Sequence, residues 1–92
     1  MKLHYKGSVR RLSGAGMAFL NFENDVTKVC ENIKIECPET SVYIRTIYDD
    51  AIEFSVFYFE KETRYFLEKG KTIEHKEEGN AFGYEITFSI ID

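Results

Sequence analysis

Alternation of apolar and polar residues with a period of two most restricts what this chain can fold into. It runs through most of the sequence after residue 40. Because successive side chains of a strand point to opposite faces of a sheet, this period predicts half-buried β-strands. The clearest predicted strand covers residues 82–90. Its inward-facing residues are Phe82, Tyr84, Ile86, Phe88 and Ile90.

One stretch, residues 17–35, follows a different period. Its apolar residues recur at steps of three and four, which is the spacing of one face of an α-helix. The members of this stripe are Phe19, Phe22, Val26, Val29, Cys30 and Ile33. The stripe predicts one long helix, which Pro38 prevents from continuing. In the alternative, residues 14–16 form a hairpin turn, residues 17–22 are a second strand, and a shorter helix begins near Asn24.

Strands are predicted before and after this stretch. Residues 2–12 alternate, and Gly7 interrupts them as a bulge would. Residues 42–48 and 52–58 predict a hairpin with two candidate loops. A two-residue loop of Asp49 and Asp50 would set Val56 opposite Tyr43 and mix the faces. Burial therefore favours a three-residue loop, with Tyr48 opposite Ile52, Thr46 opposite Phe54 and Ile44 opposite Val56.

The segment around Lys69 and Gly70 has two interpretations. As a tight turn, it joins strands 64–68 and 71–76 and pairs Phe66 with Ile73 and Glu68 with Lys71. As the end of a helix over residues 60–69, it places Gly70 just after the last turn. The strand is the favoured interpretation.

These elements predict one α+β domain spanning residues 1–92. One helix in the N-terminal half packs on a curved antiparallel sheet in the order β-α-β-β-β-β, or β-β-α-β-β-β-β with the shorter helix. At the level of topology this order resembles the cystatin-type and hot-dog-type arrangements. The Gln-x-Val-x-Gly hairpin of cystatins is absent from the sequence, so the resemblance implies no activity.

Charge is distributed unevenly along the chain. Residues 1–12 carry four bases and no acid, whereas the remaining residues carry eight bases and sixteen acids, which gives −4 overall. An acidic body argues against direct binding to nucleic acid or to anionic membranes. No apolar run is long enough to span a bilayer, and no secretory signal is visible at the N-terminus. We expect a cytoplasmic protein.

Chemical motifs are absent from the sequence. It contains no phosphate-binding loop, no metal-protease motif, no nucleophile elbow and no calcium loop. The cysteines, Cys30 and Cys37, are expected to be free thiols, with Cys30 in the core and Cys37 more exposed. Together with His4 and His75 they match no zinc-finger spacing. We therefore expect no cofactor, no metal and no enzymatic activity.

A second apolar face is the strongest functional signal. Tyr43, Ile47, Phe57 and Phe59 point away from the only predicted helix, and a sheet covered on one side should be polar on the other. Asp49 and Asp50 lie at the tip of the same hairpin, where they could meet a basic partner. These six residues form the predicted protein interface.

The predicted function is an acidic protein–protein interaction module. More specifically, it would inhibit a basic, nucleic-acid-handling protein, as immunity and phage anti-defence proteins do. The partner is another protein or a second copy in a homodimer. One alternative is a small-ligand binder or enzyme with a pocket between helix and sheet, where Tyr5, Tyr48, Tyr58 and Tyr84 supply hydroxyls. Another is a homo-oligomeric subunit of a larger assembly.

Overall fold

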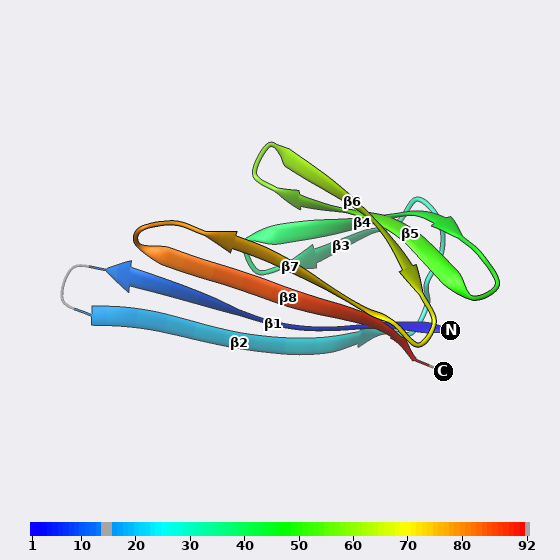
Figure 1. Cartoon of the computed structure of the whole chain (residues 1–92), viewed down its shortest axis with the longest axis horizontal. Coiled ribbons are helices and arrows are strands. Elements are labelled where there is room, and N and C mark those ends of the chain that lie inside the picture. The colour runs from blue at the N-terminus through cyan, green and yellow to red at the C-terminus, as the bar shows by residue number, and fades with distance from the viewer. Residues whose placement is uncertain (14–15, 92) are drawn as a thin grey trace.

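Two four-stranded antiparallel sheets pack face to face in the computed structural model, which describes residues 1–13 and 16–91. Figure 1 shows the two layers. Sheet A has the order β2-β1-β8-β7, with β1 Lys2–Ser13, β2 Gly16–Val26, β7 Thr72–Glu78 and β8 Phe82–Ile91. Sheet B has the order β3-β4-β5-β6, with β3 Lys34–Cys37, β4 Thr40–Ile47, β5 Ala51–Tyr58 and β6 Lys61–Glu68.

The predicted α+β fold is wrong, because the described residues contain no helix. β2 occupies the first half of the predicted helix and pairs with β1 without interruption from Val26 opposite Leu3 to Gly16 opposite Ser13. A continuous ladder with a long neighbouring strand outweighs the helical phase, since an isolated helix is marginal without packing. The alternative prediction, with a shorter helix, is correct for one segment only. Residues 17–22 are a strand, but no helix begins at Asn24, and the 14–16 turn falls largely outside the described residues.

The core lies between the two sheets, so a second sheet takes the place of the predicted helix. β8 has the predicted register, with its inward-facing side chains buried from Tyr84 to Ile90. The rings of Phe54 on β5 and Phe88 on β8 meet across the sheets with centroids 4.8 Å apart. Burial of such rings supplies most of the favourable free energy of the sandwich.

The β4–β5 hairpin uses the two-residue loop, so the predicted three-residue register is wrong. Next to the turn, Ile47 lies opposite Ile52, but farther along Ile44 lies opposite Phe54. The register shifts between these pairs because Arg45 forms a β-bulge. The bulge restores the match of faces that a two-residue loop would otherwise destroy.

β6 is a strand, as favoured, and Lys69–Gly70 is a tight turn. Gly70 has φ +84°, and the Lys71 amide donates to the Glu68 carbonyl at 3.1 Å. The turn does not close a hairpin within one sheet, however, because β6 pairs with β5 and β7 pairs with β8. The predicted pairing of Phe66 with Ile73 is therefore wrong.

Gly7 forms no bulge, since β1 keeps a constant register with both of its neighbours. The glycine is needed for a close contact. A Cβ atom there would lie 2.6 Å from Cζ of Phe22 and 2.5 Å from the carbonyl oxygen of Glu85. The missing side chain lets the Phe22 ring cover the strand and pack beside Tyr84.

Candidate protein-interaction surface

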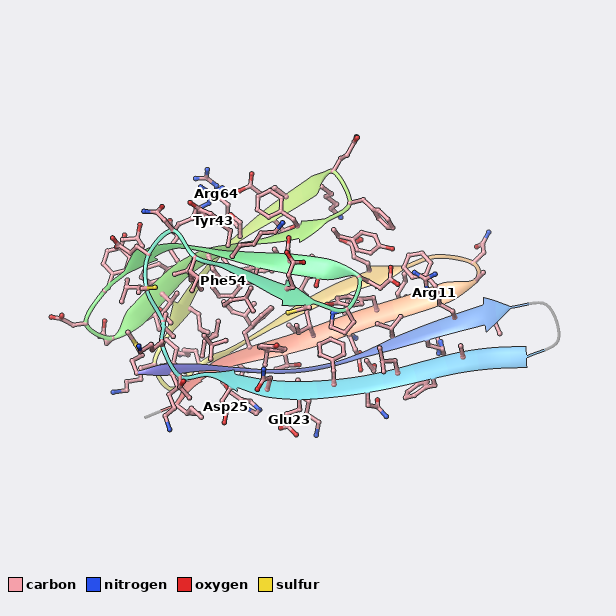
Figure 2. The ribbon with its side chains drawn as sticks, turned by 180° about the vertical axis from the view of Figure 1, so that it is seen from behind. Arg11, Glu23, Asp25, Tyr43, Phe54 and Arg64 are labelled. Atoms are coloured by element: carbon pink, nitrogen blue, oxygen red, sulfur yellow. The ribbon has the colours of Figure 1, made fainter. Side chains whose placement is uncertain are left out.

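The outer face of sheet B is built from rows of residues that pair across its four strands. One row is Glu36, Ser41, Phe57 and Glu62, and the next is Lys34, Tyr43, Ser55 and Arg64. In Figure 2, Tyr43 and Arg64 lie on the side away from sheet A, whereas Phe54 lies between the sheets. The outer face of sheet B thus carries two of the four predicted interface aromatic and aliphatic residues, Tyr43 and Phe57.

An aromatic hollow occupies one end of this face. Tyr43, Phe57 and Phe59 line it together with Lys34 and Ser41, and its volume is about 360 Å³. Phe59 is the most exposed of these rings, with 75% of its surface accessible. It is the first residue of the two-residue β5–β6 loop and has φ +54°. A bulky side chain rarely adopts this left-handed conformation.

Tyr43 is held in place within the hollow. Its hydroxyl donates to Oδ1 of Asn32 at 3.0 Å, and the Arg45 guanidinium lies 5.3 Å from the ring centroid. These contacts fix the ring at both its polar tip and its face. One wall of the hollow is therefore formed before any partner arrives.

The centre of the face is an ion-paired cluster. Oε2 of Glu62 accepts from Ser55 at 2.6 Å, from Arg45 Nη2 at 2.5 Å and from Arg64 Nε at 3.4 Å. The hydrogen bonds from Ser55 and Arg45 lower the pKa of Glu62. The cluster contains two arginines and one glutamate, so it keeps a net charge of +1.

Asp49 and Asp50 lie at the other end of β4, in the β4–β5 turn. Asp49 follows Tyr43 by six positions, mostly along β4, which corresponds to roughly 20 Å of extended chain. The structure therefore does not bring the predicted acidic pair together with the aromatic hollow. Asp49 and Asp50 instead lie beside an exposed ring pair, Tyr48 and Phe66, whose centroids are 5.6 Å apart.

The β-bulge explains two wrong placements. Ile47, predicted to face outward, packs against the core cluster, and Tyr48, predicted to pair with Ile52 in the core, is exposed. Both exchanges follow from the extra residue at Arg45. Phe66 is absent from the predicted interface for another reason: the sequence predicts that it pairs with Ile73 of the following strand. The even positions Glu62, Arg64, Phe66 and Glu68 could have marked an outward face on β6.

Carboxylates gather around the Tyr48–Phe66 pair. Glu53 lies directly opposite Phe66, and Glu68 lies opposite Ala51 next to the turn. Within the described residues, Asp49, Asp50 and Glu68 have no ion-pair partner. We name this end of sheet B, with Tyr48, Asp49, Asp50, Glu53, Phe66 and Glu68, the acidic tip.

A buried polar bridge joins the sheets at the β6 and β7 edges. The hydroxyl of Tyr65 and Nδ1 of His75 are 2.6 Å apart, and Nε2 of His75 lies 3.3 Å from Oε1 of Glu77. Burial raises the pKa of Tyr65 and lowers that of His75. A phenol that resists ionisation beside an imidazole with 3% exposure favours a structural role over nucleophilic chemistry.

The thiols and the basic strand occupy structural positions. Cys30 is exposed and Cys37 packs against the core, which reverses the predicted placement, and both are free thiols. Burial raises the pKa of Cys37 to about 11.

No group of three metal-ligating side chains occurs among the described residues. On the basic strand β1, Arg11 pairs with Glu39 across the sheets.

Comparison of the chain with family models, curated proteins and solved structures finds no match. No helix able to cross a membrane occurs in the described part of the chain.

Proposed function

We propose that this chain is a non-enzymatic protein-interaction module that docks a basic partner protein on the outer face of sheet B. The observation that carries the proposal is Phe59. This ring is largely exposed, it lies in a left-handed backbone conformation, and it borders a preformed aromatic hollow.

The backbone conformation of Phe59 is energetically unfavourable. The left-handed conformation costs an L-residue roughly 1–2 kcal/mol, and glycine avoids that cost in the first position of a two-residue hairpin loop. The exposed ring returns little of this energy by burial. Backbone strain kept at an exposed aromatic residue is typical of binding surfaces, where the side chain acts on another molecule.

The sign of the partner's charge follows from the acidic tip. Its carboxylates lie beside exposed aromatic rings, and cationic side chains bind favourably to both groups. Glu60 adds a further exposed carboxylate next to Phe59. The ion-paired centre between them keeps a net charge of +1, so the favourable contacts for a cationic partner lie at the two ends of the face. An arginine- and lysine-rich protein surface therefore fits the two ends of the face.

Such a partner is typically a nucleic-acid-handling protein. An acidic module on its cationic surface would exclude the nucleic acid, which is how an inhibitor of the immunity or anti-defence kind would act. A cytoplasmic location stays a prediction. The ligand-pocket alternative loses its basis, because there is no helix in the described residues to form the pocket and the Tyr84 hydroxyl is bonded to Thr40.

A displacement assay tests the proposal. A fluorescent single-stranded oligonucleotide is bound to a synthetic arginine- and lysine-rich peptide that also contains leucine, and its anisotropy is followed as the chain is added. We expect the chain to release the oligonucleotide without binding it directly, and the release to weaken with added salt. Asp49→Asn with Asp50→Asn should weaken release, since the double variant removes two charges from the acidic tip.

Phe59→Gly separates binding from folding. Relief of the left-handed strain, less the added entropy of unfolded glycine, should raise the free energy of unfolding by about 0.5–1 kcal/mol. The same variant should lose displacement activity. Leu12→Ser, which shortens an exposed apolar residue of sheet A outside β2, is the control and should retain it. Displacement by Phe59→Gly at the wild-type level, or no displacement by the wild type at low salt, would refute the proposal.

A further inference from the structure

The free edge of β2 is the second unusual surface of the molecule. β2 is an edge strand of sheet A and has 11 residues, whereas β3, an edge of sheet B, has only 4. Figures 1 and 2 show β2 along the margin of the sandwich, with no described strand beyond it. This edge exposes a long row of backbone donors and acceptors.

The orientation of that row can be assigned. The Asp25 amide donates to Oδ1 of Asn24 at 2.9 Å, so it points away from β1. Because backbone groups alternate sides along a strand, the N–H and C=O groups of Phe19, Asn21 and Glu23 also face the free edge. The backbone N–H and C=O groups of the intervening residues, Leu20 and Phe22, point towards β1 and bond to it.

The other three edges carry the usual protection against pairing, whereas β2 carries its only charges, Glu23 and Asp25, near one end. β7 carries Glu74, Lys76 and Glu78, β6 carries charges at alternate positions, and β3 is short. Residues 16–22 of β2 have no charge and no proline. Phe19 is 60% exposed and Leu20 is 50% exposed. A long apolar edge of this kind is a template for another strand.

We infer that a second copy of this chain pairs with β2 in antiparallel orientation, with the two-fold axis at Asn21. On the inner face this register sets Leu20 opposite Phe22 of the second copy. On the outer face it sets Phe19 opposite Glu23 of the second copy. Both exposed apolar residues therefore gain a neighbour, and each contact occurs twice because the interface is self-complementary.

Charge complementarity selects a second copy and this orientation. Arg10 lies beside Phe19 in sheet A and has no ion-pair partner among the described residues. The register brings Glu23 of the second copy, whose Oε2 lies 3.0 Å from Nε2 of its own His4, to the far side of the same Phe19, within reach of the long Arg10 side chain. Parallel pairing would instead set Glu23 and Asp25 against their own copies, which is repulsive.

Sedimentation velocity tests the inference. The wild-type chain should sediment as a dimer that dissociates on dilution. Asn21→Pro should sediment as a monomer with an unchanged circular dichroism spectrum and urea midpoint, because it removes an edge-facing N–H and none that bonds β1. If that variant folds poorly, Leu20→Lys serves in its place. Phe66→Lys, an equally exposed ring on sheet B, is the control and should remain dimeric.

Charge reversal tests the register. Arg10→Glu and Glu23→Arg should each raise the dissociation constant by roughly fivefold, and the double variant should recover the wild-type value. A monomeric wild type at millimolar concentration overturns the inference. So does a dimer that survives both edge variants, or two charge reversals whose effects add without recovery. The interface lies on sheet A, so its failure leaves the proposed function of sheet B untouched.

Discussion

The hydrogen bond between Thr40 and Tyr84 offers the sharpest test of how the two sheets are held together. Thr40 begins β4 in sheet B and Tyr84 lies on β8 in sheet A, and their hydroxyl oxygens are 2.6 Å apart. Both residues are buried. Burial also raises the pKa of Tyr84 far above its ordinary value, so the phenol stays protonated. The bond therefore joins two neutral groups.

The expected magnitudes differ between single and double variants. Tyr84→Phe leaves the Thr40 hydroxyl buried without its partner, and Thr40→Val does the same to the Tyr84 hydroxyl. Each single variant should lower the free energy of unfolding by about 1–3 kcal/mol, the cost of desolvating one unpaired hydroxyl. The double variant buries no orphaned group. It should therefore be less destabilised than the sum of the two, with a coupling of at least about 1 kcal/mol.

Urea denaturation followed by circular dichroism measures all four free energies. For a domain of this size, 1 kcal/mol also moves the thermal midpoint by about 4–8 °C, so calorimetry offers an independent check. Tyr48→Phe removes an exposed hydroxyl and should change stability by less than about 0.5 kcal/mol. Additive losses in the double variant would show that the two hydroxyls do not depend on each other and would refute the reasoning.

Three further predictions follow from the packing. Gly7→Ala should lower stability by about 1–3 kcal/mol in urea, whereas Gly16→Ala, where a Cβ meets nothing, should have no such cost. Burial holds the pKa of His75 below its ordinary 6.5, so the free energy of unfolding should be highest above that pH and should decrease as the pH falls below it. Thermal melts at a series of pH values should show a weaker pH dependence for His75→Asn. Iodoacetamide at mildly alkaline pH should modify the exposed Cys30 and spare Cys37, whose pKa is raised to about 11, as read by mass spectrometry.

The strands that the sequence predicted well are those whose alternation matches their burial. β8 is buried at every predicted position from Tyr84 to Ile90, and β1 covers the predicted residues 2–12. The prediction of a helix over residues 17–35 is wrong because the spacing of Phe22 and Val26 fits both periods. Residues four apart lie on one face of a helix and also on one face of a strand. Pairing with the preceding strand β1 decides between the two. The local signal for that pairing is the glycine-containing segment 14–16 of the alternative prediction, which the helical stripe outweighs.

The β4–β5 hairpin failed for a different reason. Matching of the faces excludes the two-residue loop only if the ladder between the strands is unbroken. The bulge at Arg45 removes that assumption. Arg45 is a polar residue that bonds Ser55 and Glu62 on the outer face, so the bulge and the ion-paired centre are one feature. Sequence alternation alone places Tyr48 inside and Ile47 outside, and the predicted interface inherits that exchange.

The geometry of the inferred dimer bears on the proposed function. Residues opposite each other in an antiparallel pair share a face, so joining two copies at β2 keeps the inner faces of both A sheets on the same side. Both B sheets then lie on that side, and their outer faces point in one direction. A partner with repeated basic segments would meet two aromatic hollows and two acidic tips at a fixed spacing. Binding at the second site becomes intramolecular, so the affinity of the pair exceeds that of either site without any new contact. If both proposals hold, pairing through the edge strand would therefore strengthen competition with nucleic acid.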